Sequence, residues 1–259
     1  MQIVWFKRDL RVVDHQPLAT AAKAGRFIAL YILEPELWQQ PDLSRRQYDF
    51  LCESLLDLKA DLAQLGCPLV IRVGSAVDIL QNLIKQYAVT DILSHQETWN
   101  GWTYQRDLAV MRSLKVRGVN WQEYKQFGVI RGLQDRDGWA RRWYHWVNQP
   151  LAPCPTIIDP INIASDNLPK AQAFGLGEDD CPYRQVGGRK QGLQYLSSFF
   201  EERGLHYTKS MSSPVSAFEA CSRLSPYIAF GCLSVREIYQ RQQAQLDRYD
   251  SAPPQHRRL

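Results

Sequence analysis

Five short apolar segments alternate with longer helical patterns over the first 125 residues, and this alternation restricts the possible folds more than any other feature. The apolar segments are Gln2–Phe6, Phe27–Leu33, Leu69–Val73, Asp91–His95 and Asn120–Tyr124. When a helix connects each strand to the next, successive strands run in the same direction. They therefore pair as a parallel sheet with helices on both faces. The chain is therefore predicted to begin with a five-stranded, Rossmann-like α/β domain.

The segments between these strands have amphipathic helical patterns. The longest begins at the capping box Ser44-Arg-Arg-Gln47 and ends at Gly66. A second begins at Ser75, a third covers residues 104–117, and a shorter, weaker one lies near residues 17–24. The apolar positions that we expect to face the sheet are Leu51, Leu55, Leu58, Leu62 and Leu65 in the first helix, Ile79, Leu80, Leu83 and Ile84 in the second, and Leu108, Met111 and Leu114 in the third.

Composition limits the classes of protein to consider. The 259 residues suit one large domain, or one domain and part of a second, and a mean hydropathy of -0.37 is typical of a soluble protein. No apolar run reaches the length of a membrane helix, and charged residues follow the apolar start at once, so neither a membrane span nor a signal peptide is expected. The net charge of +4 is compatible with nucleic acid but too small to imply it.

The spacing of the cysteines and the absence of glycine-rich phosphate motifs argue against several classes of protein. The six cysteines include no C-x-x-C pair, which favours a reduced, cytoplasmic setting with structural thiols and no metal site. A parallel sheet binds ligands at the carboxyl ends of its strands. Because neither G-x-G-x-x-G nor G-x-x-x-x-G-K-[ST] is present, a dinucleotide-dependent dehydrogenase and a P-loop enzyme are disfavoured.

Residues 97–149 are rich in tryptophan, and residues 137–146 predict an aromatic, basic helix that continues into Val147. Arg141, Arg142 and the tryptophans of this helix could form a stacking platform for nucleic acid bases. The commoner arrangement buries such tryptophans against a neighbouring domain, and we favour it here.

Six prolines interrupt residues 150–186, which show no sustained period and are predicted to form a long interdomain linker. Cys154 and Cys181 lie in this segment, but the reducing setting argues against a disulfide between them. The predicted division is an α/β domain over residues 1–130, an aromatic helix and linker over 131–186, and a helical part over 187–259.

The helical part begins after Gly187 and Gly188 with a helix that ends at Gly204. Further on, Ser225 followed by Pro226 predicts an N-cap and a first helical residue, Gly231 ends that short helix, and Ser234-Val-Arg-Glu237 is a capping box for the next. The hydroxyl groups of Ser222 and Ser225 would lie beside free N–H groups, an arrangement that suits phosphate oxygens. An ordinary capped pair of helices is the alternative.

Two of these segments resemble one protein family. Trp5-Phe-Lys-Arg-Asp-Leu-Arg11 resembles the signature that opens the amino-terminal domain of the DNA photolyase/cryptochrome family. Cys221-Ser-Arg-Leu-Ser-Pro-Tyr-Ile-Ala-Phe-Gly-Cys-Leu-Ser234 resembles the segment by which that family holds the diphosphate of FAD. Without the resemblance, residues 5–11 would be a charged loop in which Asp9 and the arginines pair with one another.

The resemblance implies a light-driven enzyme that repairs cyclobutane pyrimidine dimers in UV-damaged DNA by electron transfer from reduced FAD. It also implies an antenna chromophore of folate or deazaflavin type, a monomer, and no catalytic acid, nucleophile or metal site. The residues that it assigns to FAD are Tyr207, Cys221, Ser222, Arg223, Leu224 and Ser225. The alternatives are a cryptochrome-type photoreceptor without repair activity and a residual nucleotide-binding α/β protein.

Three departures from the family pattern bear on these expectations. Cys221 stands where the family usually has threonine, and Met211 stands where a DNA-contacting arginine is often found. The chain also stops at Leu259, so it is expected to be truncated, with only the first helices of an all-α FAD-binding domain. The apolar face of the helix after Gly188, formed by Leu193, Leu196, Phe199 and Phe200, is therefore expected to be exposed.

Overall fold

The computed structural model describes residues 1–156, 161 and 163–251 of the chain. Part of the predicted linker and the last eight residues, 252–259, lie outside the described residues. Among the helices that are described, none is both long and apolar enough to span a membrane.

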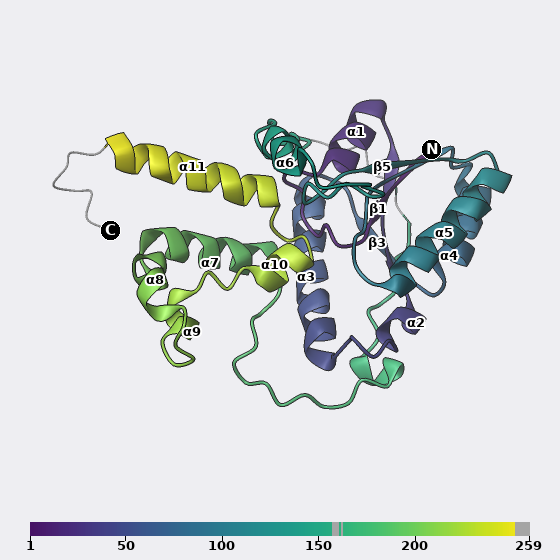
Figure 1. The fold of residues 1–259 in the computed structure, drawn as a ribbon. Helices are drawn as coiled ribbons and strands as arrows, with labels where there is room; N and C mark the ends of the chain where they lie inside the picture. Colours follow the sequence, from purple (N-terminus) through teal and green to yellow (C-terminus); the bar gives the residue numbers. More distant parts are fainter. Residues whose placement is uncertain (157–160, 162, 252–259) are drawn as a thin grey trace.

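Five parallel strands form one sheet in the order β3-β2-β1-β4-β5 (Figure 1). They are β1 Gln2–Phe6, β2 Phe27–Leu33, β3 Leu69–Val73, β4 Asp91–His95 and β5 Asn120–Tyr124. These bounds are the ones predicted from the sequence, and the α/β class is confirmed. Because β1 pairs with β2 on one side and β4 on the other, the order of strands reverses there, and such a reversal opens a crevice at the carboxyl ends of the two strands.

Helices cover both faces of the sheet. One face carries α1 Gln16–Ala24, α2 Pro35–Trp38 and α3 Arg45–Gln64, and the other carries α4 Ala76–Tyr87 and α5 Gly101–Val116. Alternate strand residues supply the two cores, because successive side chains of a strand point to opposite faces. Val4 and Phe6 of β1 pack toward α3, whereas Ile3 and Trp5 pack toward α4 and α5.

The helix α5 differs from its prediction. It begins at Gly101 rather than at Tyr104, and Met111, which was expected to face the sheet, is 49% exposed. The buried stripe includes the polar residues Thr103 and Asp107 instead. A search for apolar periodicity misses such a stripe, because two of its positions are not apolar.

The predicted aromatic helix is α6, Trp139–Val147. It packs against α11 Val235–Ser251, and the ring centres of Trp143 and Tyr239 lie 5.6 Å apart. The sequence left open whether the tryptophans form a stacking platform for bases or pack against a neighbouring element. Trp143 and Trp146 are half-buried, which agrees with packing. Trp139, in contrast, is 43% exposed.

The described residues between 150 and 186 contain one short 3-10 helix, η1 Ala171–Phe174, and several of them contact the α/β domain. The Ile71 N–H donates to the Ser165 hydroxyl at 2.9 Å, and the Tyr48 hydroxyl donates to the Pro169 carbonyl at 2.6 Å. All six cysteines are free thiols. The division of the chain at residues 130 and 186 stays a prediction.

The helical part joins the core of the sheet. Its elements are α7 Arg189–Glu201, η2 Arg203–His206, α8 Tyr207–Ser210, α9 Ala217–Ala220, α10 Ser225–Ala229 and α11. Leu196 of α7 is fully buried, because it belongs to the same apolar cluster as Tyr227 and the leucines of α3. The expected exposure of Leu196 is therefore wrong, and Leu193, Phe199 and Phe200 are half-buried.

Candidate functional site

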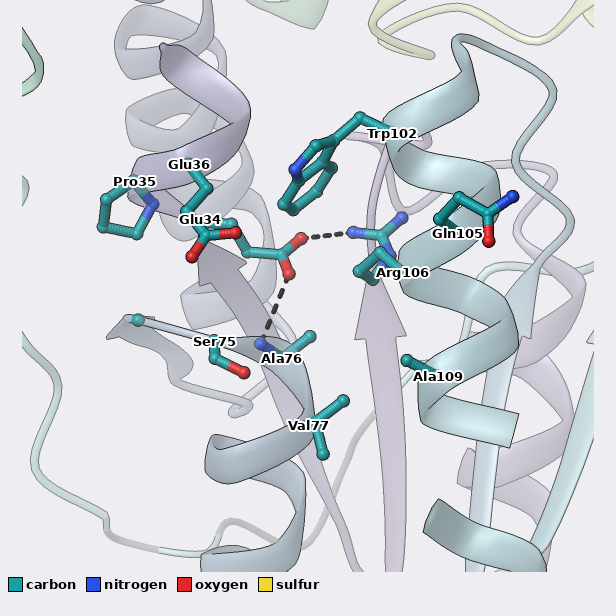
Figure 2. Close-up of a pocket in the computed structure, with 11 residues that line it drawn as sticks. Glu34, Pro35, Glu36, Ser75, Ala76, Val77, Trp102, Gln105, Arg106 and Ala109 are labelled. Carbon is teal, nitrogen blue, oxygen red and sulfur yellow. Dashed lines mark hydrogen bonds and ion pairs between the residues drawn. The ribbon is translucent and has the colours of Figure 1, made fainter. Parts of the chain in front are cut away.

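A cavity of about 440 Å³ opens at the carboxyl ends of β2 and β3, the edge at which a parallel sheet binds ligands (Figure 2). Glu34 follows β2, Ala76 begins α4, and Trp102 and Arg106 project from α5 toward Glu34. The sequence indicated the edge but not these residues, because they come from three segments that only the strand order brings together.

Ion pairs and burial determine what this cavity can accept. The Arg106 guanidinium pairs with Glu34 and Glu97, and burial raises the pKa of Glu34 to about 6. Burial opposes the charge of Arg106, but Glu97 and Glu34 outweigh it and raise the Arg106 pKa. The Ala76 N–H at the start of α4 already donates to Glu34 at 3.3 Å. A carboxylate thus occupies the position that a phosphate would take at this helix terminus.

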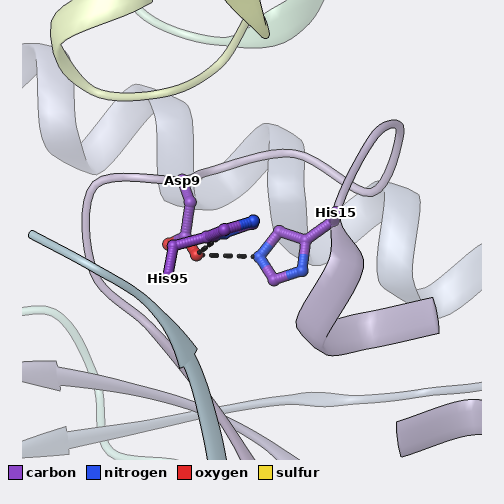
Figure 3. Close-up of side chains that lie close together, drawn as sticks. All are labelled: Asp9, His15 and His95. Atoms are coloured by element: carbon purple, nitrogen blue, oxygen red, sulfur yellow. Dashed lines mark hydrogen bonds and ion pairs between the residues drawn. The ribbon is translucent and has the colours of Figure 1, made fainter. Parts of the chain in front are cut away.

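The loop after β1 is organised by Asp9, which is fully buried (Figure 3). One carboxylate oxygen accepts from the Lys7 N–H at 2.7 Å, and the other is shared by His15 Nε2 at 2.9 Å and His95 Nδ1 at 2.8 Å. Asp9 therefore joins β1, the start of α1 and the end of β4. The alternative in which Asp9 pairs with the arginines of its own loop is wrong, because its partners are the two histidines and the Lys7 backbone.

The same three side chains could in principle ligate a metal, since their donor atoms lie within 4.8 Å of one another. Hydrogen bonds already account for them. The Leu18 N–H donates to His15 Nδ1 at 3.1 Å, which leaves Nε2 of His15 as the protonated nitrogen that faces Asp9. Burial lowers the pKa of both histidines, and that of His95 falls to about 3. Burial would raise the pKa of Asp9, but interactions with His15 and His95 hold it well below its usual range.

Neither histidine was singled out from the sequence. Asp9 follows β1 and His95 ends β4, so both lie at the carboxyl edge of the sheet. The signal that could have found the pair is the adjacency of β1 and β4, which the predicted strands alone do not specify.

The segments 5–11 and 221–234 contact each other directly. The Leu10 N–H donates to the Phe230 carbonyl at 3.2 Å, and the Arg11 guanidinium donates to the Gly231 carbonyl at 2.9 Å. Gly231 has φ +67°, and a Cβ on this residue would lie 2.2 Å from the Arg8 carbonyl oxygen. Only glycine allows the two backbones to approach so closely.

The capping groups predicted at α10 and α11 agree with the structure only in part. Helix α10 begins at Ser225 itself, and the Ser225 hydroxyl makes no capping hydrogen bond. At α11, Ser234 precedes the helix as predicted, and its hydroxyl accepts from the N–H groups of Arg236 at 3.2 Å and Glu237 at 3.5 Å. The Glu237 carboxylate, however, pairs with Arg189 at 2.6 Å and does not complete the capping box. Glu237 is drawn away because Arg189, itself buried, needs a counter-ion.

The residues predicted to contact FAD occupy one corner of the helical part. The carbonyls of Cys221 and Ser222 accept from the Arg203 guanidinium, and Leu224 is buried. Ser225 is exposed. Tyr207 lies farther away, with its ring centre 6.0 Å from that of Phe199.

Free donors in this corner fit an anionic group. In the described chain, no acceptor is found for the N–H groups of Ser222, Arg223 and Leu224. The Arg223 backbone is left-handed, with φ +58°, and its Nε is buried without a hydrogen-bond partner while its guanidinium lies 3.7 Å from the centre of the Phe218 ring. Consecutive free N–H groups beside a guanidinium are what a phosphate requires.

Comparisons with known proteins support the resemblance to one family. Residues 2–130 match the family model described as DNA photolyase. A cryptochrome DASH from Gloeobacter violaceus is 27% identical over 93% of this chain and 53% of its own length. A deoxyribodipyrimidine photo-lyase from Vibrio cholerae is 28% identical over 93% of this chain and 55% of its own. The chain belongs to the DNA photolyase/cryptochrome family.

Solved structures share the fold of this photolyase/cryptochrome chain. A cryptochrome from Synechocystis has a TM-score of 0.81 at 23% identity, over 99% of this chain and 57% of the other. An archaeal photolyase from Sulfolobus tokodaii, solved with two FAD molecules, has a TM-score of 0.70 at 22% identity, over 96% of this chain and 58% of the other. The chain thus spans about half the length of the photolyases and cryptochromes that it matches.

Proposed function

We propose that this chain supplies the antenna-binding domain and the FAD-diphosphate corner of a light-driven enzyme that repairs cyclobutane pyrimidine dimers in UV-damaged DNA. The observation that supports this most is the direct contact between the two family segments. Leu10 and Arg11 of the first segment are hydrogen-bonded to the backbone of the second, so both form one unit although they lie at opposite ends of the chain.

The corner formed by residues 221–225 would hold the FAD diphosphate. The free N–H groups of Ser222, Arg223 and Leu224 would donate to phosphate oxygens, and the Ser222 and Ser225 hydroxyls would add to them. The Cys221 thiol is a weaker donor than the threonine usual in the family, so its contribution would come from the backbone. FAD, when bound, supplies light-driven one-electron chemistry, and the residues of this chain bind and orient it.

The cavity at the sheet edge would hold the antenna chromophore. Its volume of about 440 Å³ lies in the range of small-molecule sites, and the Trp102 indole offers an aromatic surface. The Sulfolobus tokodaii photolyase is described with two FAD molecules, which are said to imply a novel light-harvesting cofactor in that protein. Because the Glu34 carboxylate occupies the start of α4, we favour a ring without phosphate at this edge, which is compatible with a folate or a deazaflavin.

A photoreceptor is the second candidate function. The relatives that match this chain include cryptochromes as well as photolyases at nearly equal identity. A cryptochrome would use the same FAD corner without acting on DNA dimers.

The test is to purify the natural polypeptide that contains this chain and measure bound FAD and dimer loss from irradiated DNA, in blue light and in the dark. If the protein is a repair enzyme, dimers should be lost from the DNA in blue light but not in the dark. Bound FAD with light-dependent reduction but no dimer loss would identify a photoreceptor, and absence of flavin would favour a residual nucleotide-binding protein. The double change S222A/S225A should weaken FAD binding, whereas the control S197A, on the half-buried Ser197 of α7, should not.

The 259-residue chain alone is expected to hold FAD at well below one molecule per chain. Ser225 is exposed, and hydrogen bonds to a solvent-exposed diphosphate contribute little net free energy because each replaces a bond to water. Equilibrium dialysis in the dark measures this, and stoichiometric FAD would contradict it.

A further inference from the structure

We propose that the groove between α6 and residues 125–130 binds the phosphodiester backbone of nucleic acid, at a site separate from the FAD corner. The groove is a cavity of about 670 Å³ whose lining includes Lys125, Arg141, Arg142 and His145. In Figure 1, α6 lies at the start of α11, whereas α7 to α10 lie on the other side of α11. None of the residues that line the groove belongs to the corner formed by residues 221–225.

The cations of this groove lack counter-ions. Lys125, Arg141 and Arg142 are exposed, and among the described residues no carboxylate lies within 4 Å of any of them. Other guanidinium groups do hold carboxylates: Arg184 pairs with Glu53 at 2.6 Å, and Arg45 pairs with Asp49 at 2.9 Å. The groove thus brings three exposed cations together, none of which is paired with a carboxylate of the described residues.

Two of these cations are also close together. A Cβ on Gly138 would lie 3.6 Å from Nη2 of Arg141 and 3.4 Å from Nη1 of Arg142, so the two nitrogen atoms lie within about 7 Å of each other. Like charges at this separation repel each other. A phosphate placed beside them would turn this repulsion into attraction, and Lys125 would extend the positive track along the groove.

The groove offers charge rather than stacking surfaces. The Arg236 guanidinium lies 5.3 Å from the centre of the Trp146 ring, and Gly128 packs against the rings of Trp143 and Trp146. Trp143 also meets Tyr239 edge to face. These contacts occupy the rings, so the groove would contact phosphates without reading bases.

The helix that forms one wall of the groove is anchored at its carboxyl end. The Gln240 side-chain amide of α11 donates to the Val147 carbonyl at 3.1 Å and to the Gln149 carbonyl at 2.9 Å, and Val147 is fully buried. Helix α6 is therefore fixed on α11, and the arginines on it would lose little freedom of the backbone on binding.

The test is fluorescence anisotropy with undamaged duplex and single-stranded DNA at salt concentrations between about 50 and 200 mM. The variant K125Q/R141Q/R142Q removes the three cations. The control K59Q/K85Q/K115Q removes the same charge from exposed lysines on α3, α4 and α5. Neither flavin nor damaged DNA is needed, so the result is independent of the proposed repair function.

For duplex DNA, the slope of log affinity against log salt should become less steep by about two to three in the groove variant, because each phosphate contact contributes about 0.9. The control should change it by less than about one. Circular dichroism should show that both variants fold. Equal slopes in the two variants would overturn the proposal, as would the absence of salt-dependent DNA binding. Inorganic triphosphate provides a further arm: if it binds the unaltered chain tightly while DNA does not, the groove serves a small anion and the proposal is overturned.

Discussion

At the scale of single residues, the hydrogen bonds around Asp9 require one protonation state: an ionised Asp9 and neutral imidazoles at His15 and His95. Both imidazoles direct an N–H group at the same carboxylate oxygen of Asp9. The second nitrogen of His15 accepts from the Leu18 backbone, so protonation of His15 would remove the cap of α1. The Asp9 cluster should therefore make the stability of the protein depend on pH.

We expect the free energy of unfolding to be greatest above about pH 6.5 and to fall as the pH decreases from there toward 3. Burial lowers the pKa values of His15 and His95 from 6.5, that of His95 to about 3, so the unfolded chain binds protons in this window that the native protein does not. Each histidine contributes at most about 1.4 kcal/mol per pH unit. Below about pH 4, protonation of Asp9 adds a further loss.

Urea unfolding at a series of pH values measures this dependence. The variant H95Q should flatten it, whereas H206Q should not, because His206 is exposed. A profile that is flat between pH 3.5 and 6.5, to within about 0.5 kcal/mol, would contradict the protonation states assigned to the cluster.

Replacing Gly231 by alanine should destabilise the protein by about 2 to 4 kcal/mol, because the new Cβ meets the Arg8 carbonyl and φ is +67°. Gly118 is a matched control. It has φ +66° with nothing within 4 Å of an added Cβ, so G118A should cost only the backbone strain of about 1 to 2 kcal/mol. Equal losses in urea unfolding would show that the close approach at Gly231 costs nothing.

At the scale of elements, α3 is shared by the sheet and the helical part. Its leucines line the core under the sheet, and its other contacts reach the start of α7. The Glu53 carboxylate accepts from the Gly187 N–H at 2.7 Å, and the Ser54 hydroxyl accepts from the Gly188 N–H at 3.0 Å. Helix α3 thus positions the first turn of α7 as well as the sheet.

The changes L55A and L62A should each cost about 2 to 5 kcal/mol, because both side chains are buried and truncation leaves a cavity. The neighbouring change L56A should cost less than about 0.5 kcal/mol, since Leu56 is 62% exposed. Thermal or urea unfolding of the three variants checks this. A loss at Leu56 as large as that at Leu55 would show that α3 is rotated from the described orientation.

The elements also show what could be predicted from sequence. All five strands and the leucine face of α3 follow from local periodicity and caps, because each signal lies within a few consecutive residues. The grouping of Arg106 with Glu34, or of His95 with Asp9, depends on strand order, which periodicity does not encode. The helix caps near Ser222 and Ser225 predicted a site for phosphate oxygens, but the assignment of this site to FAD depends on the family resemblance alone and stays a prediction.

At the scale of the whole molecule, one apolar core continues from the sheet into the helical part. The ring centre of Phe50 on α3 lies 5.2 Å from those of both Tyr227 and Phe230, and Tyr48 contacts Phe174 of the linker segment. The predicted linker therefore joins regions that are already packed together.

Residues 1–130 are expected to fold alone but to be less stable than the same domain within the whole chain. The sheet and its helices bury a core of their own, yet the fragment would expose Tyr48 and Phe50. Urea unfolding of the fragment and of the 259-residue chain compares the two. An unfolded fragment would contradict the first expectation, and equal midpoints would contradict the second.

Asp14 has a consequence for the order in which the chain acquires its structure during synthesis. Its carboxylate accepts from Ala152, Ser234 and Arg236, which are 138, 220 and 222 positions further along the chain. A ribosome has to make well over half of these 259 residues before any of these partners exists, so we expect the sheet to form while Asp14 is still hydrated. In a nascent chain stalled before Ser234, hydrogen exchange at the Leu10 amide should be fast, and it should become slow only after the segment containing Phe230 has emerged and docked.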